Sequence, residues 1–315
     1  MSVILVTGCA GFIGSHLCEA LLKNGLSVTG LDNIDSYYSV KWKEENMKVL
    51  NRYPNFNFIR GSILDSGLIK DVIKDVDTVY HLAAIPGVRN SIKNPIKYCE
   101  IDVLGTIKLL DISRKNDIKK FVFASSSSVY GEVPENELPV REDRRPNPIS
   151  PYGLAKYQGE EWCSMFDKTY GLKTVSLRYF TVFGPRQRPD EAFSKFIGKI
   201  MNNEAIEIYG DGEQTRDFTF VEDIVKGTIL GCEKGSGIYN IGGGKRISVN
   251  EIISLIEKVM NRGISKKNIE KQMGDVTHTW SDIGKSKNEL GYNPKVSIEN
   301  GIRRHFDWFK NQSGY

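Results

Sequence analysis

Short runs of apolar, often β-branched residues alternate along the first half of the chain with longer segments whose apolar residues recur every three or four positions. The short runs predict strands buried on both faces, and the longer segments predict amphipathic helices. Strands are expected at Val3–Thr7, 26–31, Phe56–Arg60, 78–82, 120–125 and 174–177, and helices at Phe12–Lys23, 68–74 and 101–115. Because strands that alternate with helices form right-handed βαβ units, the pattern predicts an α/β fold with a parallel sheet.

The second half of the chain differs in composition and in the regularity of its hydrophobic pattern. Five prolines stand among many charged residues between Glu132 and Pro151, which predicts a surface loop. Beyond Arg178 the alternation becomes irregular and rich in loops. We therefore expect a first domain at residues 1–178 and a smaller, substrate-facing domain at 179–315, with a segment within 221–241 as a candidate to return to the sheet.

Composition narrows the class of protein. The 315 residues include 43 Lys and Arg against 39 Asp and Glu, a net charge of +4 without blocks of like charge, so no nucleic-acid partner is expected. No apolar run is long enough for a membrane span, and the first residues lack the features of a signal peptide. Five scattered cysteines without metal-ligand spacing predict reduced thiols, no metal site and a cytoplasmic location.

The first predicted strand runs into a glycine-rich turn. Gly8, Gly11 and Gly14 are spaced G-x-x-G-x-x-G, with Phe12 and Ile13 between the last two, and a predicted helix follows. Glycines permit the tight turn and let backbone N–H groups approach a pyrophosphate at the helix N-terminus, where the helix dipole favours anions. The motif predicts a dinucleotide site; a glycine-rich turn without a ligand is the alternative.

Asp32 favours the dinucleotide interpretation. It ends the second strand 18 residues after Gly14, close to the spacing of about 20 residues at which an acidic side chain binds the ribose hydroxyls. Its charge would repel a 2′-phosphate, and Asn33 rather than an arginine follows it. The expected cofactor is therefore NAD rather than NADP, although an aspartate at a strand end can also be merely solvated.

A tyrosine and a lysine share one face of a later helix. Tyr152 and Lys156 are four residues apart, and Ser150 and Pro151 are start signals just before them. A tyrosine has an ordinary pKa of about 10, so it acts as a base only when positive charge, from Lys156 or an oxidised nicotinamide, lowers that pKa. The strand at 120–125 runs into serines 125–128, where a hydroxyl is placed to bridge the tyrosine and a substrate. An ordinary exposed pair beside a polar loop is the alternative.

Together these motifs resemble the extended short-chain dehydrogenase/reductases: GCAGFIG at 8–14, Asp32, HLAA at 81–84, SSSSVYG at 125–131 and Tyr152-xxx-Lys156. RYFTVFGPRQRP at 178–189, IYGDGEQTRDFTFVEDI at 208–224 and YNIGGG at 239–244 resemble the nucleotide-sugar branch of that family. The resemblance implies a doubly wound (Rossmann) NAD-binding domain and a smaller C-terminal α/β domain that binds a nucleoside diphosphate sugar. It also implies a homodimer built from two helices of each subunit.

Carried over position by position, the resemblance assigns roles to individual residues. It makes Tyr152 the base, Lys156 the anchor of the nicotinamide ribose, Ser126 the partner of the sugar hydroxyl and Arg216 a ligand of the diphosphate. It places further residues beside NAD, namely Ser62, Ile63, Leu82, Ala83 and Ala84, and others beside the substrate, namely Ser127, Ser128 and Asp275. Two positions depart from the usual pattern: Ser62 replaces a common Asp, and Asp102, which replaces a common Asn, brings a charge that needs a partner.

The reaction is predicted from the two residues that precede the sequence VYG at 129–131. Dehydratases of the branch have Asp-Glu there and decarboxylases have Glu, whereas this chain has Ser127-Ser128. Without a carboxylate to drive elimination, returning the hydride to the keto sugar remains, so the resemblance implies epimerisation at carbon 4.

The sugar is predicted from Thr181 and Arg188. UDP-glucose 4-epimerases commonly have Asn at the first position, whereas GPRQRPD resembles UDP-glucuronate 4-epimerases, in which the equivalents of Thr181 and Arg188 are associated with the substrate carboxylate. The planar donor fork of arginine suits a carboxylate. The alternative is that Arg188 is a loop arginine that shields diphosphate, because Arg186 is equally available for the carboxylate. The expected reaction converts UDP-glucuronate to UDP-galacturonate. A UDP-glucose/UDP-galactose 4-epimerase and a non-catalytic NAD-binding regulator are the alternatives.

Overall fold

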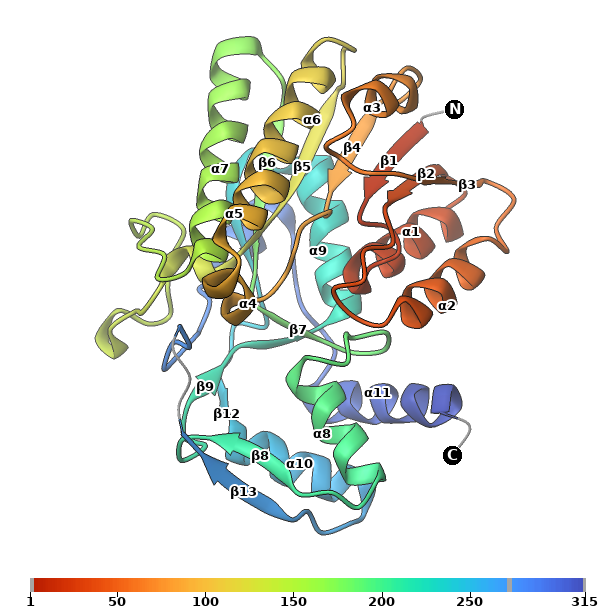
Figure 1. Ribbon diagram of the computed structural model, residues 1–315. Helices are drawn as coiled ribbons and strands as arrows, with labels where there is room; N and C mark the ends of the chain where they lie inside the picture. Colours follow the sequence, from red (N-terminus) through yellow and green to blue (C-terminus); the bar gives the residue numbers. More distant parts are fainter. Residues whose placement is uncertain (1–2, 271–273, 314–315) are drawn as a thin grey trace.

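The computed structural model describes residues 3–270 and 274–313, and its centre is a parallel sheet of seven strands (Figure 1). The strand order is β11–β6–β5–β4–β1–β2–β3, so the chain builds outward from β1 in one direction and then in the other. The strands are β1 Val3–Thr7, β2 Ser27–Asp32, β3 Phe56–Arg60, β4 Thr78–His81, β5 Lys120–Ser126, β6 Thr174–Tyr179 and β11 Gly237–Ile241. The predicted doubly wound α/β class is confirmed, and the six strands predicted from the sequence are present to within two residues.

Helices cover both faces of this sheet. One face carries α1 Phe12–Lys23, α2 Val40–Leu50 and α9 Val221–Lys234, and the other carries α3 Ser66–Val72, α6 Gly105–Arg114 and α7 Pro151–Tyr170. Successive strand residues alternate between them: Ile4 and Val6 belong to the cluster under α1 and α9, and Leu5 belongs to the cluster under α3, α6 and α7. Because both faces are buried, these strands are continuously apolar in sequence.

Helix α2 was not predicted, and the predicted helix at 101–115 has a more complex form. The buried face of α2 includes Lys43 and Asn46, so polar residues mask its period. The segment before α6 is a π-helix, η1 (Cys99–Leu104), which follows the short helices α4 (Val88–Lys93) and α5 (Pro95–Tyr98). Two 3-10 turns lie between β5 and α7, namely η2 (Ser127–Tyr130) and η3 (Glu135–Glu137).

The chain leaves the sheet-containing part after β6, forms most of a second part, and then returns to the sheet. After β6 the chain forms β7 (Thr181–Phe183), enters the second part, and returns through β10 (Phe218–Phe220) to α9 and β11, which pairs in parallel with β6. Residues 221–241 therefore belong to the sheet-containing part. The remaining elements are α8 Ala192–Met201, β8 Ile206–Tyr209, β9 Thr215–Arg216, β12 Ile247–Ser248, α10 Val249–Met260, β13 Lys266–Ile269, η4 Ser286–Leu290 and α11 Ile298–Ser313.

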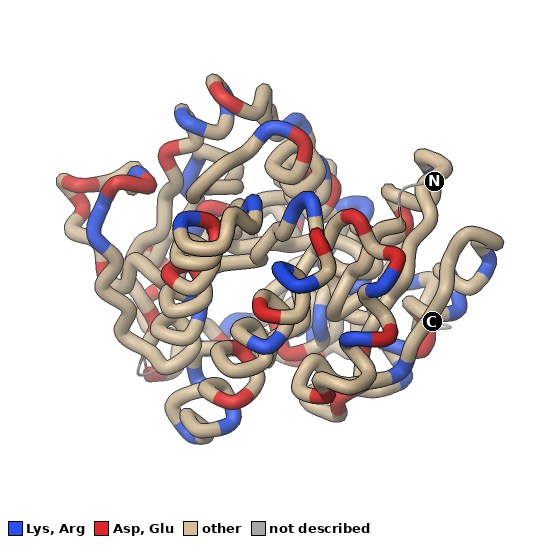
Figure 2. Tube along the Cα trace, turned by 90° about the horizontal axis from the view of Figure 1, so that it is seen from above, with Lys and Arg blue, Asp and Glu red and all other residues tan. Residues whose placement is uncertain are grey.

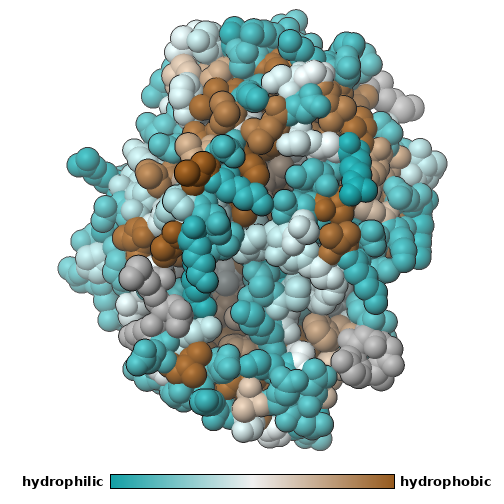
Figure 3. Space-filling model, in the orientation of Figure 1, coloured by the Kyte–Doolittle hydropathy of each residue, from teal (hydrophilic) through white to brown (hydrophobic). Residues whose placement is uncertain are grey.

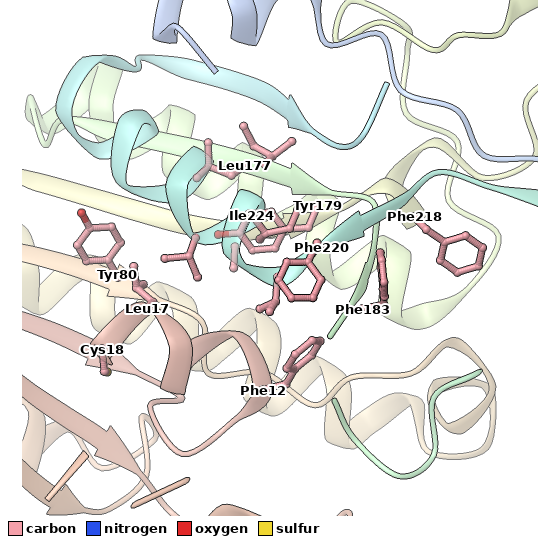
Figure 4. Close-up of a cluster of buried hydrophobic side chains, with 14 of the residues drawn as sticks. Phe12, Leu17, Cys18, Tyr80, Leu177, Tyr179, Phe183, Phe218, Phe220 and Ile224 are labelled. Carbon is pink, nitrogen blue, oxygen red and sulfur yellow. The ribbon is translucent and has the colours of Figure 1, made fainter. Parts of the chain in front are cut away.

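One hydrophobic core connects the two parts. Figure 4 shows the cluster extending from Leu17 and Tyr80 beside the sheet to Phe183, Phe218 and Phe220 of β7 and β10. There the Phe183 and Phe193 rings stack with centroids 4.6 Å apart. This shared core fixes the start of α8 relative to the sheet, and with it the loop between β7 and α8.

The surface is mixed in charge and hollowed near mid-height. Basic and acidic residues are interspersed along the trace in Figure 2, and the hollow in Figure 3 lies between the sheet and the second part. Within residues 3–270 and 274–313, no helix combines the length and apolar character needed to cross a membrane, and no cluster of three or more His, Cys, Asp or Glu is arranged to hold a metal ion.

Candidate active site

A cleft of about 580 Å³ follows the carboxyl ends of β1 to β6 and reaches β7 and α8. Ligands of doubly wound proteins bind at this edge of the sheet. Every site residue predicted from the sequence lines the cleft except Arg186 and Arg216. A larger hollow of about 890 Å³ beside α7 and β11 is lined largely by charged surface residues and contains none of the predicted ones. The smaller cleft is therefore the candidate site.

The glycine-rich turn forms one end of the cleft and leaves no space for a side chain at Gly8 or Gly14. Gly8 has φ +74°, and a Cβ added there would lie 2.8 Å from the backbone nitrogen of Ala83. A Cβ on Gly14 would lie only 2.1 Å from the carbonyl oxygen of Gly8. No side chain of the described residues caps α1 at Gly11, so the first N–H groups of this helix remain available to an anion.

Asp32 closes the same end of the cleft. Its carboxylate accepts hydrogen bonds from the backbone N–H groups of Ala10, at 3.1 Å, and Ile34, at 2.8 Å. Burial raises its pKa, and the positive charge of Lys43 opposes that rise. Asn33, Ser62 and Ile63 line the cleft beside it. Lys43 was missed from the sequence because it lies on the buried face of the unpredicted helix α2.

Ser126, Tyr152 and Lys156 meet at the centre of the cleft. Ser126 ends β5, and its oxygen accepts a hydrogen bond from the backbone N–H of Ser128 at 3.1 Å. The Ser150 side chain caps α7 at the N–H of Gly153, which places Tyr152 in the first helical turn. Lys156 lies one turn later, where its Nζ donates to the carbonyl of Ala124 at 2.9 Å and stands 5.9 Å from the Tyr152 ring centroid.

The electrostatics of Tyr152 differ from the expectation. Burial raises its pKa to about 12, and the largest lowering contributions come from the Ser126 hydrogen bond and the charge of Arg188 rather than from Lys156. Burial also lowers the pKa of Lys156, while the negative charge of Asp102 opposes that shift. With a pKa this high, the phenol is protonated at neutral pH.

Asp102 lies behind this centre in the π-helix η1. One of its oxygens accepts from the backbone N–H of Ile85 at 2.8 Å, and the other is buried without a hydrogen-bond partner in the described part of the chain. Burial raises its pKa to about 6, and Lys156 opposes that rise. The sequence predicted that the charge of Asp102 needs a partner. The structure gives it the positive charge of Lys156, which acts without a direct hydrogen bond.

The other end of the cleft is formed by Thr181, Ser127, Ser128 and Arg188. The Nε and Nη2 atoms of Arg188 donate to the carboxylate of Asp190 at 3.0 and 3.1 Å, and Nη1 lies 2.9 Å from Glu191. Glu191 was not predicted from the sequence, where nothing distinguishes it from a surface glutamate. The arginine expected to meet a substrate carboxylate is therefore already paired with two carboxylates of its own loop.

The two remaining arginines are engaged outside the lining of the cleft. Arg186 pairs with Glu19 of α1 at 2.5 Å and does not line the cleft. Arg216 donates to the carbonyls of Thr215, Val276 and Thr277 at 2.7 to 3.0 Å. Beside Arg216, the predicted substrate residue Asp275 lines the cleft and pairs with Arg89 at 2.5 Å.

Comparison with known proteins agrees with this geometry. Residues 5–305 match the sequence profile of the GDP-mannose 4,6 dehydratase family. A UDP-glucuronate 4-epimerase of Thermodesulfobacterium geofontis is 39% identical over 316 residues, spanning 98% of this chain and 97% of the relative.

Solved structures are similar over the same length. UDP-glucuronic acid 4-epimerase from Bacillus cereus, in complex with UDP-glucuronic acid and NAD, is 41% identical with a TM-score of 0.94, covering 98% of this chain and 99% of that chain. UDP-glucose 4-epimerase from Thermotoga maritima, with UDP-glucose, is 36% identical with a TM-score of 0.92 and the same coverage. The chain therefore belongs to the GDP-mannose 4,6 dehydratase family, among the extended short-chain dehydrogenase/reductases that are nucleotide-sugar 4-epimerases.

Proposed function

We propose that this protein is an NAD-dependent isomerase that interconverts UDP-glucuronate and UDP-galacturonate through a 4-keto intermediate. The observation that carries the proposal is the single cleft in which Ser126, Tyr152 and Lys156 lie between the glycine-rich turn and Arg188. A redox cofactor at one end and an acidic sugar at the other would then meet at the tyrosine.

The residues at the first end fit a dinucleotide. The turn at Gly8 and Gly14 has no room for side chains, so only backbone faces a pyrophosphate there. The Asp32 carboxylate accepts two backbone hydrogen bonds and, with about four lone-pair sites in all, can still accept from ribose hydroxyls. When bound, NAD supplies the hydride acceptor for carbon 4, the later hydride donor, and a positive charge beside the phenol.

The chain's own residues move the proton. The Tyr152 phenolate would take the proton of the sugar 4-hydroxyl and return it after the keto sugar has turned over. The Ser126 hydroxyl, which already lowers the pKa of Tyr152, would hold that sugar hydroxyl. Lys156, fixed on the Ala124 carbonyl, keeps further N–H donors for the cofactor ribose.

Two features support epimerisation of a uronate over elimination. The η2 residues Ser127 and Ser128 line the cleft with hydroxyls, which do not supply the acid and base that loss of water requires. Thr181 and Arg188 line the sugar end, where an arginine can bind a carboxylate and discourage its loss as carbon dioxide. We assign the diphosphate to the side of Arg216 and Asp275, as the family resemblance implies.

A specific observation keeps UDP-glucose/UDP-galactose as a second candidate. Asp190 and Glu191 already neutralise Arg188, so a neutral sugar would meet no unpaired positive charge there. The non-catalytic NAD-binding regulator has no such support, because Ser126, Tyr152 and Lys156 lie together.

Incubation with UDP-glucuronate or UDP-glucose, followed by chromatography of the UDP-sugars, distinguishes these functions. We expect UDP-galacturonate from the first without net reduction of added NAD. Tyr152→Phe should abolish turnover while NAD stays bound, because the variant loses the proton acceptor but no part of the glycine turn. Full activity in Tyr152→Phe would contradict the assignment of the base, and turnover of UDP-glucose alone would favour the second candidate.

Three further proposals concern the whole protein. A homodimer is supported by the exposed apolar residues Ile96, Leu104 and Leu154 of α5, η1 and α7, which are 44 to 74% exposed. Light scattering in solution tests it.

Five free cysteines support the reducing cytoplasm, which cell fractionation tests. We also propose that residues 1–178, completed by α9 and β11, bind NAD and that the rest binds the nucleotide sugar, which crosslinking with photoreactive analogues tests.

A further inference from the structure

Two carboxylates pair with the guanidinium of Arg188, and only one of them lines the cleft. Asp190, which does not line the cleft, holds the Nε–Nη2 edge in a bidentate pair at 3.0 and 3.1 Å. Glu191, which does line the cleft, holds Nη1 at 2.9 Å. A ligand that enters the cleft thus meets Arg188 where Glu191 is already bound.

Glu191 is not held there by a helix-capping role. It is the residue that precedes α8, a position at which a side chain often accepts from the first helical N–H groups. Within the described residues the Glu191 side chain makes no such bond. Its carboxylate is turned toward Arg188 instead, and its backbone N–H donates to the Arg188 carbonyl at 3.2 Å.

The charges of this pair act on the catalytic centre. Arg188, Glu191 and Tyr152 line the same cleft, and Arg188 lowers the pKa of Tyr152 whereas Glu191 raises it. Arg188 also stands over the Tyr37 ring, 5.8 Å from its centroid. The titratable groups that share charge interactions with Glu191 are Arg188 and Asp190 of its own loop, Tyr37 and Tyr38 after β2, and Tyr152 of α7.

We propose that Glu191 is a selectivity residue: its carboxylate occupies the position on Arg188 that the carboxylate of a uronate sugar must take. This inference rests on the proposed function and specifies how the same site chooses between acidic and neutral sugars. One guanidinium with two carboxylates carries a net negative charge, and a third carboxylate in this partly buried place is strongly disfavoured. Binding of a uronate therefore requires Glu191 to take up one proton from solvent, which leaves Arg188 to the substrate.

A neutral sugar needs no such exchange, because it brings no third carboxylate. Burial already raises the pKa of Glu191 above its ordinary value, so proton uptake is easier here than at an exposed glutamate. The affinity for the acidic sugar should therefore rise as the pH falls, and the affinity for the neutral sugar should not.

Calorimetry in buffers of different ionisation enthalpy tests this directly. We would use NAD-loaded protein in a Tyr152→Phe background, which prevents turnover, and titrate UDP-glucuronate and UDP-glucose. We expect uptake of about one proton with the first and about none with the second. Adding Glu191→Gln should abolish the uptake and tighten UDP-glucuronate by roughly tenfold at pH 8, a factor equal to one unit of pKa. UDP-glucose should bind nearly as before.

Glu204→Gln is the matched control, because it makes the same change in an exposed residue soon after α8. Proton uptake that persists in Glu191→Gln, or weaker binding of UDP-glucuronate by that variant, would overturn the proposal and make Glu191 a support for Arg188. Absence of uptake in the Tyr152→Phe protein itself would overturn it without any change at Glu191. Failure of the wild-type protein to epimerise UDP-glucuronate would instead reject the proposed function, whatever the calorimetry gives.

Discussion

The two ends of the cleft are lined by different chemical groups, backbone at one end and charged side chains at the other. At the cofactor end the chain presents backbone, because Gly8 and Gly14 lie against carbonyl and amide groups with no room for a Cβ. At the sugar end it presents the charged side chains of Arg188 and Glu191, which pair with each other, and Arg188 also pairs with Asp190. The first end is specified by sterics and the second by a balance of charge.

This difference predicts different responses to change. A close-packed backbone turn cannot accept an extra methyl group without moving, so the cofactor end should lose function abruptly. A set of paired charges can be rebalanced by a proton or by a single substitution, so the sugar end should change its preference gradually. Related enzymes can thus share the first end and differ in their sugars at the second.

The largest effect is expected at the cofactor end from Gly14→Ala. The new Cβ would lie 2.1 Å from the Gly8 carbonyl oxygen, so the turn must open and its N–H groups leave their positions. We expect NAD to bind roughly 100-fold more weakly, a loss of about 2.7 kcal/mol. Titration with NAD, followed by quenching of tryptophan fluorescence, measures it.

Gly263→Ala is the control for this substitution. A Cβ at Gly263 meets no atom within 4 Å, so the same extra methyl group should leave NAD affinity and melting temperature nearly unchanged. Equal loss of affinity in the two variants would show that the turn is not the steric site, and normal affinity in Gly14→Ala would remove the contrast between the two ends.

The same contrast explains what the sequence revealed. Six of the seven sheet strands, the glycine turn, Asp32 and the Tyr152–Lys156 pair are local patterns, because backbone geometry and spacing along one helix or strand determine them. Lys43 was missed because its helix has no clear apolar period, although it is buried beside Asp32. Local spacing finds a site built of backbone more readily than one built by tertiary packing.

The sugar end shows where sequence reasoning stops. Arg186 and Arg188 are two residues apart and equally suited to a carboxylate, yet one pairs with Glu19 of α1 and the other lines the cleft. Their different surroundings follow from the left-handed backbone of Arg186, at φ +64°, and from the packing of α1 beneath it. Neither is encoded in the motif GPRQRP.

A smaller effect on function, together with a pH-dependent change in stability, is expected from Asp102→Asn, in the centre between the two ends. The pKa of Asp102 is raised from 3.8 to about 6, so the folded protein holds this proton more tightly than the unfolded chain. Its contribution to stability therefore falls as the pH rises from about 4 to about 6 and stays low above that. The variant should lack this fall and gain at most about 3 kcal/mol at pH 8 relative to pH 4.

Denaturant unfolding of both proteins at pH 4 and pH 8 measures the difference. Because Asp102 also raises the pKa of Tyr152, the acid limb of the pH profile of kcat/KM should move to lower pH in Asp102→Asn. A stability difference that does not depend on pH would show that the carboxyl group of Asp102 has the same pKa in the folded and the unfolded chain, which would contradict the raised pKa on which this prediction rests.

The smallest effect, and the sharpest test of the sugar end, is expected from Arg188→Ala set against Arg186→Ala. Loss of Arg188 raises the pKa of Tyr152 and so slows both sugars, but only a uronate also loses a charged hydrogen-bond partner. We expect kcat/KM for UDP-glucuronate relative to UDP-glucose to fall by roughly tenfold, the lower end of what a hydrogen bond to a charged group provides, because Asp190 and Glu191 already compete for that arginine. Arg186→Ala breaks only the pair with Glu19 and should leave the ratio unchanged. Equal falls in the ratio would mean that both arginines reach the sugar, and no fall in either would mean that the acidic group is bound elsewhere in the cleft.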